Sequence, residues 1–517
     1  MKNLTSAQRP SGMPLHKYQR YEPFTLSDRT WPYKVPTRAP IWASVDLRDG
    51  NQALIDPMGI ERKRRLYEHL IALGFKEIEV GFPLSCESDW QFTRYVIEHD
   101  LIPDDVTIQV MSPIRDGMIE RTVESVRGAP RVILQIYHPT STVQRRVVFR
   151  KSKAEIKELA LNGARTALRL RDSLPDTEIQ LQYATESFSQ TEPEFALDLC
   201  NAVLEMWQPV AADRTRIVLP TTVECYPPHE FADRIEWMSR NLAYRDQIIL
   251  SLHPHNDRGC GVAATELALL AGAERVEGTL FGNGERSGNV CLMTLGMNLF
   301  SQGIDPELDL SDLDASRRLV EECNLLPVSV RHPWVGDFVY TSFAGSHQDA
   351  INKGMRARAE SAQVKWEVPY LPIDPADIGR EYQPLVRINS QSGKGGIAYL
   401  LRAEHGFDLP RRLQIEFAAL VQQRAETGSE IKPDQIWEWF RQRYLSGASG
   451  PLDTGDVLQV HTHPLPDGSF VCYTELRVGE VIRWGVGVGD TAEEALTRSR
   501  NGAAGRFAEE DDDEHAS

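Results

Sequence analysis

The chain has 517 residues, of which 41% are hydrophobic, and its formal net charge is −17. The composition is ordinary for a globular protein, and this length predicts about three domains unless one large α/β barrel takes up half of the chain. The negative charge disfavours nucleic acid as a partner, because phosphates require a basic surface. No run of about 18 apolar residues is present, so the sequence predicts no membrane-spanning helix.

The N-terminal sequence and the seven cysteines bear on the cellular compartment. MKNLTSAQRPSGMP lacks the apolar stretch of a signal peptide, and no two cysteines form a C-x-x-C pair. Scattered cysteines in odd number, without a secretion signal, are typical of reduced thiols, so we expect a cytoplasmic protein. Residues 1–35, rich in Pro, Arg and Tyr, read as an N-terminal arm.

Eight short apolar runs then alternate with helical patterns. In IERKRRLYEHLIALG, Leu66, Leu70 and Leu73 share one helical face, and Gly74 follows as the expected residue after the helix. The alternation predicts a (β/α)8 TIM barrel over residues 36–325. A doubly wound sheet is the rival, but the first strand is followed by RDGNQ and not by a dinucleotide-binding glycine motif. The predicted strands are 41–47, 76–82, 106–111, 131–137, 178–184, 216–220, 247–252 and 275–281.

Beyond about residue 326 the pattern changes. Residues 326–400 hold many aromatics and prolines and read as a first subdomain, and two amphipathic helices predict a helical second subdomain over 401–449. SGASGPLDTGD is a linker by composition. Residues 450–517 then predict one shortened ββα unit.

In that unit, SFVCYTELRVGEVIRWGVGVG predicts two strands. Thr491 and Glu494 form a plausible capping box for a helix that runs to about Asn501. The acidic tail from Glu509 is expected to be solvated and disordered.

The seventh predicted strand ends in HPHND. In an extended segment His253 and His255 point to the same side, so both imidazoles can meet one ion. A bare H-x-H is more often a pair of ordinary strand-end histidines. In a barrel, however, the first and seventh strands end at one mouth, and this favours Asp49, His253 and His255 as an open three-ligand metal site. Such ligands suit Zn, Mn, Co or Fe, and Mg less well.

The other strand ends carry weaker candidates. Arg48 is either an oxyanion-stabilising cation or part of a surface salt bridge. Glu186 either positions a water or substrate hydroxyl or lies near a helix N-cap. Thr222 either donates to a substrate carboxylate or caps a helix. The glycine-rich loop LFGNGERSGN follows the eighth strand, and its polar candidates are Asn283, Glu285 and Asn289.

Outside the barrel, two further side chains are candidates for a distant acid or base. They are His347 in GSHQDAINKG and Tyr370 in VPYLPID. On spacing alone, a buried structural role is the more common one for such residues.

Several long motifs occur together and in order: VDLRDGNQALIDPM, KEIEVGFP, ILSLHPHNDRG, LFGNGERSGNVCL, AGSHQDAINKG, VPYLPIDP and RINSQSGKGG. From about Pro40 to about Leu445 the chain resembles the long bacterial and actinobacterial type of the 2-isopropylmalate synthase family. That family belongs with the Claisen-condensing barrels that include homocitrate and citramalate synthases. The resemblance implies that acetyl-CoA is joined to a small-molecule 2-oxo acid and that the thioester is then hydrolysed.

The resemblance also implies a metal site. Asp49, His253 and His255 match the ligands of a divalent metal, expected to be Mg, Mn or Zn, and Asn289 matches a residue beside it. The metal would polarise the C2 carbonyl of the 2-oxo acid. Arg48 matches the residue that stabilises the developing alkoxide.

Further roles follow from the same resemblance. Glu186 and Thr222 match positions of the substrate pocket, and we expect Glu186 to act in catalysis. His347 and Tyr370 match subdomain residues that help to deprotonate the acetyl-CoA methyl group. In the family these two residues reach the site from the partner chain, so a homodimer is expected.

The sequence departs from the family pattern in the pocket and at the C-terminus. Gln135, Ala184 and Val218 stand where relatives carry His, Ser and Asn. The expected substrate is 2-oxoisovalerate, and the alternative is a larger 2-oxo acid in specialised metabolism. Relatives also bind leucine between two ββα-like units, and because one unit is visible here we expect weak or absent leucine inhibition.

Two other classes of function share parts of this pattern. A lyase that cleaves a CoA ester on the same barrel shares the Asp and H-x-H ligands, but the HQDAINKG and VPYLPIDP region argues against it. A non-catalytic leucine- or CoA-binding regulator is disfavoured because every proposed metal ligand is present.

Overall fold

The computed structural model contains two compact units, residues 1–335 and 336–517, and each is considered by itself. No helix among the described residues is long and apolar enough to cross a membrane. Most of the predicted linker SGASGPLDTGD and most of the motif RINSQSGKGG lie outside the described residues. The structure describes residues 11–342, 344–360, 365–382, 394–425, 433–446 and 455–514.

The first unit contains the predicted TIM barrel. Its eight strands pair in parallel and in chain order, and β1 also pairs with β8, which closes the barrel. Every predicted strand is confirmed, with ends that differ by at most a few residues. The strands are β1 (Ile41–Ser44), β2 (Glu77–Gly81), β3 (Thr107–Pro113), β4 (Arg131–Pro139), β5 (Glu178–Glu186), β6 (Arg216–Thr221), β7 (Ile249–Pro254) and β8 (Arg275–Gly278).

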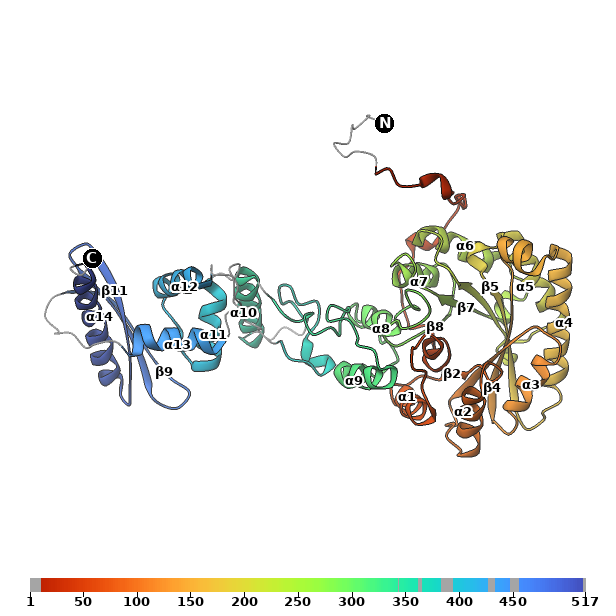
Figure 1. Cartoon of the computed structure of the whole chain (residues 1–517), viewed down its shortest axis with the longest axis horizontal. Coiled ribbons are helices and arrows are strands. Elements are labelled where there is room, and N and C mark those ends of the chain that lie inside the picture. Colours follow the sequence, from red (N-terminus) through yellow and green to blue (C-terminus); the bar gives the residue numbers. More distant parts are fainter. Residues whose placement is uncertain are drawn as a thin grey trace. The chain divides into compact units, whose positions relative to one another are not determined.

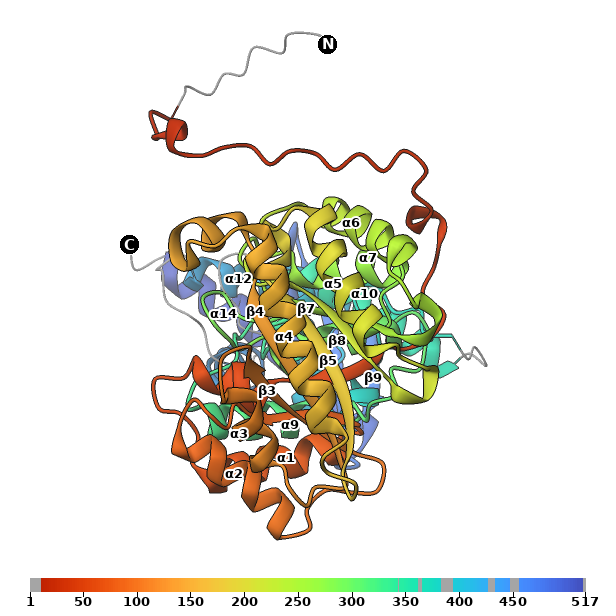
Figure 2. The same ribbon diagram turned by 90° about the vertical axis from the view of Figure 1, so that its right-hand side faces the viewer.

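Helices surround these strands on the outside (Figures 1 and 2). The first one ends as predicted, because Gly74 adopts a φ of +102° and the next amide, of Phe75, donates back to the carbonyl of Leu70. The helices of this unit are α1 (Ile60–Ala72), α2 (Glu87–Glu98), α3 (Met118–Ser125), α4 (Lys153–Arg171), α5 (Pro193–Trp207), α6 (Pro228–Asn241), α7 (Gly261–Leu270), α8 (Leu292–Phe300) and α9 (Leu313–Asn324).

The last part of the N-terminal arm lies along α6. The carboxylate of Glu236 accepts hydrogen bonds from the backbone amides of Thr30 and Trp31, and the indole nitrogen of Trp31 donates to Asp233 at 2.7 Å. These buried carboxylates therefore fix the chain just before it enters β1.

The second unit begins with helices, which are followed by a small antiparallel sheet of order β11-β10-β9 and a last helix. The sheet has three strands, not the two predicted from the sequence. β9 was missed because it is a largely exposed edge strand and so lacks an apolar pattern. The elements are α10 (Gly345–Glu360), α11 (Lys394–His405), α12 (Arg411–Ala425), α13 (Pro433–Phe440), β9 (Asp456–Pro464), β10 (Phe470–Val478), β11 (Val481–Gly489) and α14 (Ala492–Glu514).

Helix α14 packs directly on β11. A Cβ atom on Gly485 would lie 1.8 Å from the carbonyl oxygen of Ser499, so only glycine allows this approach. The hydroxyl of Thr491 accepts from the Glu494 amide, as the predicted cap requires, whereas the Glu494 carboxylate accepts from Asp490. The helix continues to Glu514, past the predicted end and into the acidic stretch that was expected to be disordered.

Candidate active site

The turn after β1 carries two of the candidate residues. Asp46–Gly50 form a single π-helical turn in which the amides of Asp49 and Gly50 both donate to the carbonyl of Val45. π-Helical turns are rare in proteins, and those that do occur often lie at functional sites. The turn holds Arg48 and Asp49, both buried, at the carboxyl end of the barrel.

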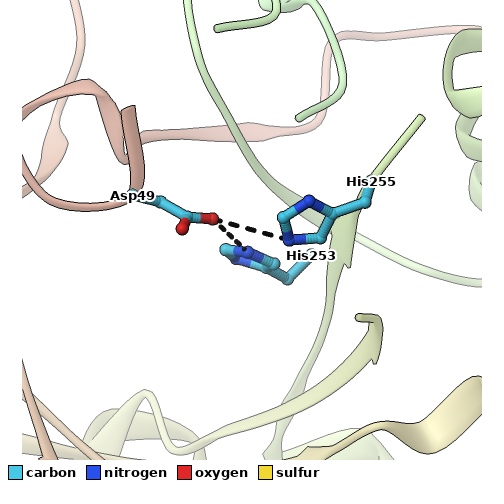
Figure 3. A group of neighbouring side chains, drawn as sticks. All are labelled: Asp49, His253 and His255. Atoms are coloured by element: carbon cyan, nitrogen blue, oxygen red, sulfur yellow. Dashed lines mark hydrogen bonds and ion pairs between the residues drawn. The ribbon is translucent and has the colours of Figure 1, made fainter. Parts of the chain in front are cut away.

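Asp49, His253 and His255 converge at this mouth (Figure 3). The Nε2 atoms of His253 and His255 lie 3.0 Å and 3.6 Å from Oδ2 of Asp49. One ligand atom from each of the three residues lies within 4.8 Å of the others, and all three side chains are buried. Within the described part of the chain, this is the one cluster of His, Cys, Asp and Glu suited to hold a metal ion.

The chemistry of the donors fits a divalent cation. Two imidazoles and a carboxylate leave further positions of a Zn or Mn ion open to substrate. Nδ1 of His255 and Oδ1 of Asn289 are buried without a hydrogen-bond partner, and the Asn289 amide donates to Oδ2 of Asp49 at 2.7 Å. Polar atoms buried in this way indicate that the site is built for a further polar group.

The local electrostatics favour an ionised Asp49 and a neutral His255, whereas they favour a protonated His253. Burial would raise the pKa of Asp49, but Arg48 and His253 outweigh it and hold that pKa well below its usual range. Burial, with His253 nearby, lowers the pKa of His255 to about 4. Burial would also lower the pKa of His253, yet its contacts with Asp49 and Glu277 raise it to about 9. A bound cation would therefore displace a proton from His253.

Close packing against Asn289 explains why the loop after β8 carries glycine at position 284. A Cβ atom on Gly284 would lie 1.8 Å from Oδ1 of Asn289, so a larger residue there would push Asn289 away from Asp49. The Asn283 amide donates to the carbonyl of Gly50 at 2.9 Å and so ties this loop to the β1 turn.

A cavity of about 380 Å³ opens beside Asp49, His253 and His255. The glutamate at the end of β5, Glu186, faces it, and burial raises the pKa of this carboxyl. The hydroxyl of Thr222 also lines the cavity and accepts a hydrogen bond from the Ser187 amide at 2.8 Å. The sequence candidates in the wall are Arg48, Asp49, Gln135, Ala184, Glu186, Val218, Thr222, His253, His255 and Glu285.

His347 and Tyr370 lie in the second unit. Their rings stack on each other with centroids 4.1 Å apart, and both side chains are exposed to solvent. The buried structural role that spacing favours therefore does not apply. Tyr370 has a φ of +64°, a left-handed conformation that is uncommon for a bulky residue and is frequent at functional sites.

Two buried carboxylates of the site were missed from the sequence. Oε2 of Glu277 accepts a hydrogen bond from Nδ1 of His253 at 2.7 Å, and Oε2 of Glu79 accepts one from Nε of Arg48 at 2.7 Å. Both residues lie inside apolar strand runs. The only signal available was their spacing, since Glu77 and Glu79, like Arg275 and Glu277, are two residues apart and face the same side of a strand.

Comparison with known proteins identifies the family. The HMGL-like family model matches residues 39–320, and the model described as alpha-isopropylmalate synthase, post-catalytic domain-like, matches residues 337–402. A 2-isopropylmalate synthase from Parafrankia sp. (strain EAN1pec) is 49% identical over 98% of this chain and 100% of its own length. The chain belongs to the 2-isopropylmalate synthase family. A 2-isopropylmalate synthase of Kocuria rhizophila is 52% identical over 93% of this chain and 84% of its own length.

Solved structures similar to part of this chain include two HMG-CoA lyases. The one from Bacillus subtilis has a TM-score of 0.46 and 18% identity, over 57% of this chain and 98% of that chain. The one from Pseudomonas aeruginosa has a TM-score of 0.45 and 18% identity, over 55% and 93%. Nothing about function follows from likeness at this level. Membership of the synthase family and the matched post-catalytic domain favour a synthase over a lyase or a non-catalytic regulator.

Proposed function

We propose that the chain condenses acetyl-CoA with 2-oxoisovalerate and hydrolyses the thioester, giving 2-isopropylmalate and free CoA. The methyl carbon of acetyl-CoA, after losing a proton, bonds to C2 of the 2-oxo acid, whose carbonyl oxygen becomes the hydroxyl. Water then cleaves the thioester. The observation that carries this proposal is the buried ligand group Asp49, His253 and His255 beside a cavity, in a chain about half identical to 2-isopropylmalate synthases.

Asp49, His253 and His255 would hold a divalent metal, Mg, Mn or Zn, with Asn289 beside it. A metal in this position supplies Lewis-acid polarisation of the 2-oxo acid carbonyl. Asp49 contributes the charge, and His255 contributes a neutral imidazole because burial keeps its pKa near 4.

Arg48 stabilises the oxygen on which negative charge develops. Two buried carboxylates hold its guanidinium, Asp49 at 3.1 Å and Glu79 at 2.7 Å. It also lines the cavity, so a fixed cation faces the reacting carbonyl and needs no reorganisation.

The remaining wall binds the 2-oxo acid. Thr222 donates its hydroxyl proton to the carboxylate, and Glu186 positions the water or the substrate hydroxyl. Ala184 and Val218 supply an apolar surface for the isopropyl group, and Gln135 closes it with an amide. The names of the relatives favour 2-oxoisovalerate over the larger 2-oxo acid considered above.

His347 and Tyr370 help to remove a proton from the methyl group of acetyl-CoA. Their stacking and exposure suit residues that act on another surface. We place them over the active site of a partner chain, so the working unit is a homodimer. The cysteines form no C-x-x-C pair, and the relatives are biosynthetic enzymes, so we assign the enzyme to the cytoplasm. Its substrates are small molecules, and we assign it no nucleic-acid partner.

A thiol-release assay tests this function. Purified full-length chain, acetyl-CoA and Mn²⁺ are mixed with pyruvate, 2-oxobutyrate, 2-oxoisovalerate, 2-oxoisocaproate or phenylpyruvate, and product is identified by mass spectrometry. We expect the highest kcat/KM with 2-oxoisovalerate and a product of the mass of 2-isopropylmalate. No thiol release with any of the five acids contradicts the proposal.

A further inference from the structure

Glu277 occupies the centre of the barrel directly beneath the ligand group. It lies on β8 and is completely buried. One carboxylate oxygen accepts from Nδ1 of His253 at 2.7 Å. The other accepts from Nη1 of Arg275 at 2.6 Å and from Nε2 of Gln182 at 2.8 Å. A carboxylate that accepts at both oxygens has no freedom to turn.

Arg275 is itself held at its far end. Its guanidinium also donates to Oε2 of Glu77 and to Oε1 of Gln109, and Glu77 accepts from the buried Arg216. The charges alternate from Arg216 through Glu77 and Arg275 to Glu277. In this series, Glu77 lines the cavity at the N-terminal ends of the strands, and Glu277 lines the cavity beside His253.

This arrangement determines which nitrogen of His253 faces Asp49 and His255. Because the carboxylate accepts a hydrogen bond from Nδ1, Nε2 is left to face Asp49. A carboxylate in this position fixes the tautomer of a metal-binding imidazole and increases its basicity. The same carboxylate reaches the pocket wall, since Gln182 donates both to Glu277 and to Oε1 of Gln135.

We propose that Glu277, anchored by Arg275, is the positioning residue of the metal centre, which directs Nε2 of His253 at the cation. The inference rests on the proposed function, because it presumes that His253 binds a metal. Glu277 also lines the cavity, but its contact with the proposed metal ligands is the hydrogen bond from His253, through which it acts. Nearly isosteric replacement by glutamine keeps the volume, removes the charge and leaves one oxygen to serve both His253 and Arg275.

Mn²⁺ binding to the full-length protein tests this role at fixed pH. The free Mn²⁺ signal in electron paramagnetic resonance gives Kd for wild type, Glu277→Gln and Glu236→Gln. The last is a matched control, because Glu236 is also a buried carboxylate with backbone amide donors but lies on α6 at the arm. We expect Glu277→Gln to raise Kd about 10- to 100-fold, and Glu236→Gln to leave Kd within twofold while lowering the melting temperature.

If the wild-type protein binds Mn²⁺ and Glu277→Gln binds it with the same Kd, the inference is overturned and the proposed function stands. No Mn²⁺ binding by the wild-type protein would contradict the proposed function itself. If Glu277→Gln does not fold, Glu277→Asp keeps the charge beside Arg275 but draws the carboxylate back from His253. A raised Kd in that variant supports the positioning role, and an unchanged Kd overturns it.

Discussion

The two mouths of the barrel contain cavities of opposite character. The cavity at the N-terminal ends of the strands is the larger, about 740 Å³ against about 380 Å³ at the other mouth. Among its charged side chains, Lys76 forms an ion pair with Asp105 and Arg214 forms one with Glu77. At the C-terminal mouth, two imidazoles and Asp49 converge instead. The convergence of side chains that could hold a metal ion, and not the size of the cavity, therefore distinguishes the C-terminal mouth.

Removing one ligand at the C-terminal mouth should have the largest effect. We expect His253→Ala to lower kcat at least about a thousandfold, because carbonyl polarisation by a metal is worth several kcal/mol. Its Mn²⁺ Kd should rise as well. Thiol release and Mn²⁺ titration check both results. The control is His69→Ala, a histidine of α1 that bonds Ser316. Wild-type activity in His253→Ala would exclude this residue as a ligand.

Substitution of Arg48 tests whether its guanidinium group stabilises the transition state. Arg48→Lys keeps the charge but loses the planar fork that Asp49 and Glu79 hold. We expect kcat to fall roughly 10²- to 10³-fold, as when an oxyanion donor is removed, with the Mn²⁺ Kd changed only a few-fold. Steady-state kinetics separate the outcomes, since a rise in KM at unchanged kcat would mean that Arg48 only binds substrate.

The apolar wall should have a smaller effect. Val218 is buried and lines the cavity. Val218→Ala enlarges the space for the 2-oxo acid. The preference in kcat/KM should therefore shift about tenfold towards 2-oxoisocaproate, which is the discrimination that one or two methylene groups provide in such a pocket. The ratio of kcat/KM for 2-oxoisocaproate and 2-oxoisovalerate measures the shift. An unchanged ratio would place the side chain of the substrate against another part of the wall.

A substitution at the N-terminal mouth should have the smallest effect. Lys76 and Asp105 are both more than half exposed, at 55% and 63%. Lys76→Ala should leave kcat and KM within twofold and change the free energy of unfolding by less than about 1 kcal/mol, as for exposed ion pairs. Urea unfolding and the thiol-release assay measure both. A tenfold loss of kcat would break the contrast between the two mouths.

The sequence was sufficient to predict the barrel and the convergence of three polar side chains at its mouth. Helices and strands alternate with clear periods, and closure brings the ends of β1 and β7 to one mouth, so Asp49 could be paired with His253 and His255 in advance. β9 could not be found in this way. Val457 and Val460 are exposed in it, so burial imposes no alternation on its residues.

The carboxylates under the site could not be predicted either. Glu277 stands alone in RVEGTLF, and no neighbour along the chain indicates its partner. Its partners come from three other strands and its own, namely His253 on β7, Gln182 on β5, Gln109 on β3 and Arg275 on β8. Such contacts depend on the register of the closed barrel, which periodicity does not determine.

Anomalous scattering from Mn²⁺ in crystals of the full-length protein tests the central claim most directly. We expect one strong anomalous peak at the C-terminal mouth, within ligand distance of Oδ2 of Asp49 and Nε2 of both His253 and His255. The N-terminal cavity should show none. A peak in the N-terminal cavity alone, or no peak at the three ligands at saturating Mn²⁺, would contradict it.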